Sequence, residues 1–321
     1  MFSIIIPLYN KAAHIKKAVQ SVLDQTFSQF ELIIINDGSG DNGPDIVKAF
    51  SDPRIRLIDQ SNSGVSTARN NGVRAATFEY IAFLDADDWW APDYLEAMKG
   101  LIESHPEAGI YAAKYALVKN GRKTEAVIGL PEGFTSGYIN YFVTYSRTMW
   151  MPLHCSSTIL PKAVFLEQKG FKPDLKLGED FELWVRIALS HPVVFLNKVL
   201  MYYNQDVDVT IRGVNPAKFH PPHAHYIYNL AQFSRDEQKN SDLKKLLDKL
   251  RAQALLKYHL HGVNPDETDQ ILKIIDFDNI SAAIKRQYDY PKPVIRLYWN
   301  IKTLLSVIKQ WFLRTFFAAY N

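Results

Sequence analysis

The sequence predicts an α/β fold built on a doubly wound, mostly parallel sheet with flanking helices, followed by a C-terminal helical appendage. In the first hundred residues, short apolar runs alternate with segments of helical periodicity, as in successive βαβ units. The apolar runs are nearly continuous, which is typical of strands covered by helices on both faces. The connections are short, so right-handed crossovers are expected.

The strand and helix pairs of the N-terminal half follow from these patterns. Each apolar run ends in polar or turn residues and is followed by apolar positions spaced three or four apart. The expected strands cover 3–8, 30–35, 54–58 and a run that begins at Tyr80, and the expected helices cover 13–23, 46–50, 64–76 and 93–104.

The second part of the domain has a less regular pattern. Asn120-Gly121 predicts a tight hairpin between strands over 109–118 and 123–128. Residues 129–152, rich in glycine and proline, are expected to form an irregular surface excursion. The remaining expected elements are strands over 155–160, 193–196 and 200–203 and helices that begin at residues 162 and 178.

The chain is expected to divide into an α/β domain over 1–210, with halves 1–100 and 101–210, and a helical region over 211–321. Composition is that of a globular protein, with 47% hydrophobic and 22% charged residues, and a net charge of +3 gives no reason to expect nucleic-acid binding. The single cysteine excludes an internal disulfide. No signal peptide or bilayer-spanning stretch is evident, so a cytoplasmic location is expected.

Three carboxylates follow the run that begins at Tyr80, where a parallel strand would reach the ligand-binding edge of the sheet. Strand alternation would place Asp85 and Asp87 on one side and Asp88 on the other. Two converging carboxylates suit a hard divalent cation that keeps positions for water and substrate phosphates. The alternative is an acidic turn before the next helix, and Asp88 is expected to cap that helix.

Six motifs together resemble the family-2 glycosyltransferases of the GT-A fold. In chain order they read S-I-I-I-P-L-Y-N, S-V-L-D-Q-T, F-E-L-I-I-I-N-D-G-S-G-D, N-S-G-V-S-T-A-R-N-N-G, I-A-F-L-D-A-D-D-W-W-A-P and G-E-D-F-E-L-W-V-R. The resemblance covers about residues 1–205, and the combination is specific although each motif alone is weak. It implies an inverting transfer of a sugar from a nucleotide diphosphate to a hydroxyl of a saccharide or lipid-linked saccharide, in surface polysaccharide or glycolipid synthesis.

The resemblance assigns donor binding to the carboxyl ends of the first strands. Pro7 and Tyr9 would lie against the base and ribose, and Asp37 would accept a hydrogen bond from the base. A uracil offers such a ring N–H, so a UDP-sugar donor is expected; an ordinary turn at Asp37 is the alternative. Arg69 would contact the nucleotide or its phosphates, or else form a surface ion pair. Asn36 stands where many relatives carry Asp, so altered ribose or base geometry is expected.

The resemblance also assigns the chemical roles. Asp85 and Asp87 match the D-x-D motif: Asp87 would ligate Mn²⁺ or Mg²⁺, and Asp85 would face the ribose or meet the ion directly or through water. Asp180 matches the second residue of an E-D pair and would be the catalytic base, while Glu179 would orient the acceptor. The alternative for this pair is a helix start that carries acidic residues.

Three further residues are acceptor-side candidates. His154 would touch the sugar or the diphosphate, or else be a buried, hydrogen-bonded histidine. Trp89 and Trp90 would stack on a sugar face, although at least one of them is expected in the core.

The tail over 292–319 has one apolar helical stripe, flanked by lysines and arginines, and no acidic residue follows Asp289. Such a basic amphipathic helix fits the inner surface of an anionic membrane; docking on its own domain or in a homodimer is the alternative. Two other classes of function remain. A sugar nucleotidyltransferase would carry a glycine-rich N-terminal signature that is missing, and a non-catalytic nucleotide-sugar or saccharide-binding module would need no base at Asp180.

Overall fold

A computed structural model of the protein describes residues 1–207, 218–299 and 301. The chain forms two compact units, Met1–Tyr226 and Ile227–Asn321. The predicted boundary after residue 210 lies outside the described residues, as does most of the predicted amphipathic tail.

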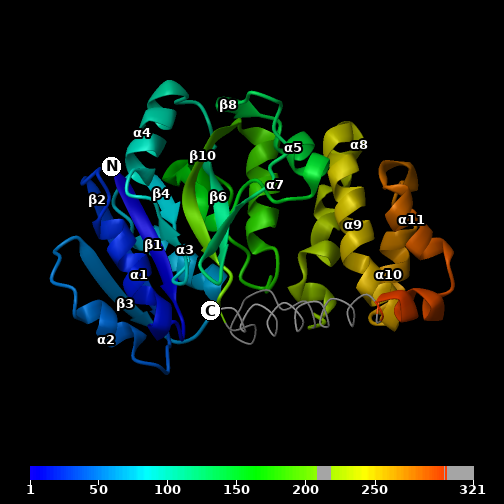
Figure 1. The fold of residues 1–321 in the computed structure, drawn as a ribbon, viewed down its shortest axis with the longest axis horizontal. Helices are drawn as coiled ribbons and strands as arrows, with labels where there is room; N and C mark the ends of the chain where they lie inside the picture. The colour runs from blue at the N-terminus through cyan, green and yellow to red at the C-terminus, as the bar shows by residue number, and fades with distance from the viewer. Residues whose placement is uncertain (208–217, 300, 302–321) are drawn as a thin grey trace, which may run out of the picture. The chain divides into compact units, whose positions relative to one another are not determined.

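The first unit is built on a ten-stranded sheet, and four of its strands form a parallel block at one side (Figure 1). Helices connect these strands, which confirms the predicted doubly wound half. In order across the sheet the strands are β3 (Ile55–Gln60), β2 (Phe30–Asp37), β1 (Phe2–Leu8) and β4 (Tyr80–Phe83). The helices of this half are α1 (Ala12–Leu23), α2 (Gly43–Lys48), α3 (Val65–Ala75) and α4 (Tyr94–Ser104).

Beyond β4 the sheet becomes mixed. Strand β9 (Thr158–Pro161) lies antiparallel between β4 and β6 (Ile110–Lys119), and β10 (Val193–Asn204) pairs parallel with β6. Three short strands join antiparallel: β5 (Trp89–Trp90) and β8 (Ser136–Ile139) on β10, and β7 (Arg122–Glu125) on β6 through the predicted hairpin. The helices are α5 (Tyr141–Thr148), α6 (Lys162–Glu167) and α7 (Glu179–Ser190).

Three details of the second half differ from prediction. Residues 129–152 are not an irregular excursion, because they contain β8 and α5. The strand expected from residue 155 begins at Thr158, since Cys155–Ser157 forms a 3-10 turn, η1. The two short strands expected over 193–203 are one continuous strand, β10, with an irregular register between Leu196 and Met201.

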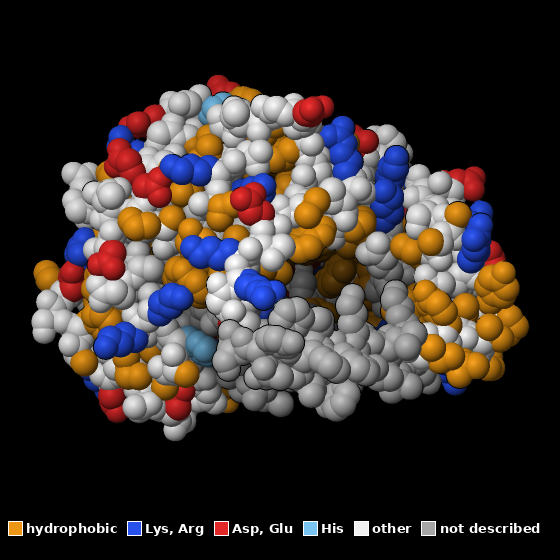
Figure 2. Space-filling view, viewed as in Figure 1, with side chains coloured by type: hydrophobic (Ala, Val, Ile, Leu, Met, Phe, Trp, Pro, Cys, Tyr) orange, Lys and Arg blue, Asp and Glu red, His pale blue; other side chains and the backbone are white. Residues whose placement is uncertain are grey.

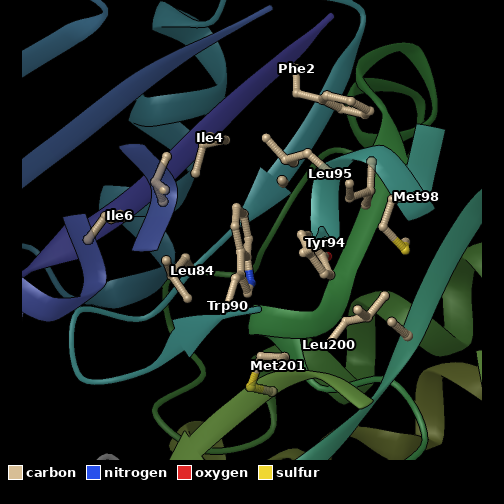
Figure 3. Packing of buried hydrophobic residues seen from close by; sticks show 14 of the residues in the cluster. Phe2, Ile4, Ile6, Leu84, Trp90, Tyr94, Leu95, Met98, Leu200 and Met201 are labelled. Atoms are coloured by element: carbon tan, nitrogen blue, oxygen red, sulfur yellow. The ribbon is translucent and has the colours of Figure 1, made fainter. Parts of the chain in front are cut away.

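The core of the first unit lies on both faces of β1. Ile4 and Ile6 are buried in the cluster that also holds residues of α1 and α4, whereas Ile5 faces α3. Gly72 allows α3 to approach, because a Cβ there would collide with Ile5. Figure 3 shows Trp90 among Ile4, Leu84 and Tyr94, so the chain that leaves β4 is anchored directly in this core.

The second unit is helical, as the sequence predicts. Asn240 caps the helix over 241–261 by accepting hydrogen bonds from the backbone of Asp242 and Leu243. Inside this unit, buried Arg251 is paired with Glu237. Its elements are α8 (Ser234–Lys239), α9 (Ser241–His261), α10 (Pro265–Leu272), η4 (Phe277–Asn279), α11 (Ala282–Asp289) and a helical segment over 292–299. A 3-10 segment, η3 (Tyr226–Phe233), begins at the last residue of the first unit, and another, η2 (Pro222–Ala224), lies within the first unit.

No helix within the described ranges is both long enough and apolar enough to cross a membrane.

Candidate active site

The three carboxylates after β4 have three different partners. The strand ends at Phe83, and the chain turns so that the N–H of Asp88 donates to the carbonyl of Asp85 over 3.0 Å. Asp85 pairs with Arg69, and Asp87 with Lys11. Strand alternation therefore does not extend through this loop, and each acidic side chain is placed by its own contact.

Asp88 does not cap the following helix, so that prediction is wrong. Its side chain is buried, at 1% exposure, and accepts hydrogen bonds from Ser156 Oγ at 2.7 Å and the N–H of Asn204 at 3.0 Å. The N-terminal cap position of α4 is Asp93. Burial, with the nearby charges of Asp87 and Asp85, raises the pKa of Asp88 well above its usual value. Asp88 thus joins the loop to η1 and β10 through a buried carboxyl group.

Arg69 lies on α3 and bridges two carboxylates. Its Nη2 is 2.6 Å from Asp85 Oδ1 and its Nη1 is 2.9 Å from Glu179 Oε1, and the side chain is 4% exposed. The guanidinium of Arg69 is therefore buried, and its two contacts are not ion pairs on an exposed surface. Burial alone would raise the pKa of Asp85, but the charge and hydrogen bond of Arg69, together with contributions from His154 and Lys11, outweigh burial and hold this pKa below its usual value. Arg69 therefore ties the loop after β4 to the start of α7 and keeps Asp85 ionised.

Asp180 lies in the first turn of α7, directly after Glu179. Gly178 precedes the pair with φ +76°, and a Cβ at this position would collide with Tyr226, so the approach to the helix requires glycine. Asp180 Oδ1 accepts a hydrogen bond from the N–H of Phe181 at 2.7 Å. Burial, and then the charge of Glu179, raise the pKa of Asp180 to about 7, while Arg69 acts in the opposite direction. A carboxyl with this pKa can both take up and release a proton near neutral pH.

Four tyrosines lie close enough to Asp180 for its charge to act on their hydroxyl groups: Tyr115, Tyr141, Tyr145 and Tyr226. Burial is the main cause that raises their pKa values; the charge of Asp180 comes next for Tyr226, and after that of a neighbouring tyrosine for the other three. The ring of Phe181 lies between two of them, with centroids 6.0 Å from Tyr145 and 5.2 Å from Tyr226. These residues were not predicted individually. The only signal was the tyrosine content of residues 129–152, two of whose tyrosines lie one helical turn apart on α5.

His154 is buried next to this cluster. Its Nδ1 accepts a hydrogen bond from the N–H of Ser156 at 3.2 Å, and its ring lies 4.7 Å from that of Tyr203 and 5.3 Å from that of Tyr115. Burial lowers the pKa of His154 to about 4, although the charge of Asp85 acts in the opposite direction. The imidazole is therefore neutral at physiological pH.

Asp37 is an anchor for the loop before α3. Its carboxylate accepts from Gln60 Nε2 at 2.7 Å, Ser63 N at 2.8 Å and Gly64 N at 2.9 Å. This loop leads into the helix that carries Arg69, so Asp37 helps to position both. Of the other predicted donor residues, Pro7 is half-buried in β1 and Tyr9 is exposed at its end.

The two tryptophans after the acidic loop have different environments. Trp90 lies in the core, stacked on Tyr94 at 4.2 Å between centroids, and its indole N–H donates to the carbonyl of Ser156. Trp89 is half-buried, stacked on Tyr202 at 5.7 Å, with the ammonium of Lys17 over its ring. Of the pair, only Trp89 has a side chain near the surface.

Asp85 and Asp87 are the carboxylates that fit a hard divalent cation. Their ion pairs use Oδ1 of Asp85 and Oδ2 of Asp87, and the second oxygen of each accepts no hydrogen bond from the described residues. Among residues 1–207, 218–299 and 301, no group of three or more His, Cys, Asp or Glu is arranged to hold a metal ion. A two-carboxylate donor set suits an ion that also takes water and substrate phosphate oxygens as ligands.

Comparison with known proteins gives a family and a fold. Residues 3–156 match the model described as "Glycosyl transferase family 2". An uncharacterized glycosyltransferase of Rickettsia felis is 31% identical over 199 residues, 62% of this chain and 32% of that protein. Glycosyltransferase GlyA of Streptococcus pneumoniae is 31% identical over 211 residues, 63% of this chain and 30% of that protein. The chain thus spans about a third of the length of these relatives.

Solved structures share the architecture. S. aureus TarS 1-349 in complex with UDP-GlcNAc superposes with a TM-score of 0.64 at 19% identity, covering 89% of this chain and 83% of that one. The same protein in complex with UDP gives a TM-score of 0.60 at 20% identity, covering 80% of this chain and 71% of that one. This likeness shows that the described fold is of the GT-A type.

Proposed function

Because this chain belongs to glycosyl transferase family 2 through residues 3–156, we propose that it is an inverting glycosyltransferase. It moves a sugar, of the hexosyl or N-acetylhexosaminyl type, from a nucleotide diphosphate donor to a hydroxyl of a saccharide or lipid-linked saccharide. The observation that carries the proposal is the continuous set of contacts from Asp85 through Arg69 to Glu179, the residue before Asp180. It brings the D-x-D loop and a carboxyl with a pKa of about 7 into one site.

Asp180 is the catalytic base of this proposal. With a pKa of about 7, a substantial fraction of its carboxyl is ionised at neutral pH and can accept the proton of an attacking hydroxyl. A less basic carboxylate would be ionised more fully but would take the proton less readily. General-base assistance of this kind contributes a factor of about 10²–10⁴ to the rate.

Asp87 and Asp85 would hold Mn²⁺ or Mg²⁺, and when bound the ion supplies Lewis-acid stabilisation for the charge on a departing diphosphate. Arg69 contributes by keeping Asp85 ionised. The buried Asp88 fixes the loop from behind by its contacts with Ser156 and Asn204, so the two ligand carboxylates stand on an anchored backbone.

A UDP-sugar is the proposed donor. Asp37 holds the loop over 61–64 at the carboxyl edge of β2, with Pro7 and Tyr9 at the end of the neighbouring β1. This edge is where a nucleotide binds in open α/β sheets. The TarS structures were solved with UDP and with UDP-GlcNAc, which supports a uridine nucleotide for a chain of the same fold.

Two measurements test the proposal. A thermal-shift screen of UDP- and GDP-sugars should raise the melting temperature with UDP-sugars, because a ligand that binds only the native state stabilises it. UDP release from the best donor should then fall strongly in Asp180→Asn. A non-catalytic binding module would show the same thermal shift but equal UDP release in the wild type and the variant, and a GDP-sugar preference would overturn the donor assignment.

We also propose that the C-terminal unit contacts the inner face of an anionic membrane, where lipid-linked acceptors of surface polysaccharide or glycolipid synthesis would be found. Figure 2 shows apolar side chains gathered over this unit. The exposed large apolar residues near its described end are Tyr290, Val294, Leu297, Tyr298, Trp299 and Ile301. The same segment carries Lys292 and Arg296 and no acidic residue. This combination is typical of helices that lie in the interface of anionic bilayers.

Sedimentation with vesicles tests this contact. The protein should bind vesicles that contain phosphatidylglycerol more strongly than vesicles of phosphatidylcholine alone, and Leu297→Gln should weaken the binding. If the protein stays in the supernatant to the same extent with both kinds of vesicle, the proposal is contradicted. If the protein instead forms a concentration-dependent dimer that Leu297→Gln dissociates, the apolar patch is a contact with a second copy of the chain.

A further inference from the structure

A lysine stands where the local structure gives no reason for one. Lys11 is the N-terminal cap residue of α1, and its side chain makes no capping hydrogen bond. The N-terminus of a helix is the positive end of its dipole, so a cation there is unfavourable. The first amide of the helix, Ala12 N, is instead satisfied by Asp41 Oδ2 at 2.8 Å. The helix therefore gains nothing from the charge of Lys11.

The ammonium of Lys11 is directed at the D-x-D motif. Its Nζ lies 2.6 Å from Asp87 Oδ2, and the two side chains are 14% and 17% exposed. The preceding residue, Asn10, has φ +50°, and its Oδ1 accepts a hydrogen bond from Gly40 N at 2.8 Å. The residues on both sides of Lys11 are thus fastened to the loop after β2, which fixes the backbone from which the side chain reaches Asp87.

The two carboxylates of the motif are neutralised in a parallel way. Asp85 has the guanidinium of Arg69 at 2.6 Å, and Asp87 has the ammonium of Lys11 at 2.6 Å. The two cations differ in kind. Arg69 presents a planar guanidinium that also contacts Glu179, whereas the ammonium of Lys11 is a compact point charge on a flexible stem, which can turn from one oxyanion to another nearby.

We propose that Lys11 is an anion-binding residue of the donor site, which pairs with Asp87 before the donor binds and with the diphosphate of the donor afterwards. The inference rests on the proposed function, since it assumes a nucleotide diphosphate beside Asp87. It has a second consequence: the ammonium competes with any cation for Asp87 while no nucleotide is present.

Calorimetric titration with UDP and with uridine, both at saturating Mn²⁺, tests the proposal. Lys11→Met should lower the affinity for UDP by about 10-fold to 100-fold, as expected when a hydrogen bond between charged groups is lost. Its affinity for uridine should be unchanged, because uridine has no phosphate. Lys11→Arg, which keeps the positive charge, should retain most of the UDP affinity. Lys16→Met, at an exposed position of the same helix, is the matched control and should leave both affinities unchanged.

Binding of Mn²⁺ alone, followed by electron paramagnetic resonance, gives an independent readout. Lys11→Met should bind the ion several-fold more tightly than the wild type, because the competing ammonium is gone. Equal losses for UDP and uridine with weaker Mn²⁺ binding would overturn the proposal and leave Lys11 as a loop-holding residue. Unchanged UDP affinity in Lys11→Met would also overturn it. If the wild type itself binds no UDP, the proposed function fails, and this inference fails with it.

Discussion

Arg69 and Glu179 are 110 positions apart in the sequence, yet Nη1 of the arginine lies 2.9 Å from Oε1 of the glutamate. The same guanidinium contacts Asp85. One buried cation therefore fixes the loop after β4 against the first turn of α7, where Asp180 stands. The site depends on this contact both for its geometry and for its charge balance.

Removal of the guanidinium group of Arg69 should destabilise the fold. Arg69→Met would leave Asp85 and Glu179 partly buried without a counter-charge, which typically costs about 3–5 kcal/mol. Urea unfolding should show this loss as a lower midpoint with an unchanged m-value. Arg74→Met, at an exposed position of the same helix, is the control and should change little. Equal midpoints for the two variants would show that the bridge does not stabilise the protein.

The activity should depend on pH through Asp180. A base must be deprotonated, so kcat/KM should rise with pH, bend near the pKa of about 7 and level off above it. Glu179→Gln removes a negative charge that raises this pKa, so its bend should lie at lower pH. A profile that is flat between pH 5 and 9, or a bend that Glu179→Gln moves upward, would argue against Asp180 as the base.

The raised pKa of Asp180 should also make the stability of the folded protein depend on pH. The folded-state pKa of Asp180 is about 7, above the ordinary value of 3.8, so its ionisation disfavours the folded state as the pH rises through this interval. Asp180→Asn removes this cost. Its melting temperature should exceed that of the wild type at pH 8, and the difference should shrink as the pH falls to 5. A constant difference across this range would contradict the raised pKa.

Asp37 should matter for stability as well as for the donor. In Asp37→Asn, one carboxylate oxygen becomes an amide group that cannot accept from Ser63 N or Gly64 N. An unsatisfied buried donor costs about 1–3 kcal/mol, and the loosened loop should also weaken UDP binding. Asp45→Asn, at an exposed position of α2, should leave both quantities unchanged. Normal UDP affinity in a destabilised Asp37→Asn would restrict Asp37 to a structural role.

Asp87 and Asp88 should differ in their response to amide substitution. If Asp87 is a metal ligand as proposed, Mn²⁺ should increase the UDP affinity of the wild type, and Asp87→Asn should abolish this increase because an amide is a poor substitute for a ligand carboxylate. Asp88→Asn should keep this increase, because the side chain of Asp88 is buried against Ser156 and Asn204 and is not one of the two proposed ligands. Titration with UDP, with and without Mn²⁺, measures both. If Asp88→Asn lost the Mn²⁺-dependent increase in UDP affinity while Asp87→Asn kept it, Asp88 rather than Asp87 would be the metal ligand.

The parallel half of the sheet could be predicted because its strands are local, continuously apolar and separated by short helices. Helix α5 could not, because its buried residues include Thr144 and Ser146 and its cap, Asn140, looks like an ordinary turn residue. Strand β10 was split in prediction at Asn197 and Lys198, but its pairing with β6 carries the chain across these exposed residues. Pairing with a neighbouring strand thus determined the extent of β10, which local periodicity alone does not specify.

Motifs located the acidic loop and Asp180, but not what each side chain contacts. The capping role expected for Asp88 failed because its side chain is buried against Ser156 and Asn204, and the cap position of α4 is Asp93. The pairing of Arg69 with Glu179 and that of Lys11 with Asp87 cross 110 and 76 positions, and no local pattern carries such information.

The most direct test of the account is an anomalous-diffraction map of Asp180→Asn crystals grown with Mn²⁺ and UDP. We expect a manganese peak against Asp87, the diphosphate beside it, and the side chain at position 180 facing the same pocket from the start of α7. A peak remote from Asp85 and Asp87, or a side chain at position 180 turned away from the bound nucleotide, would contradict the account.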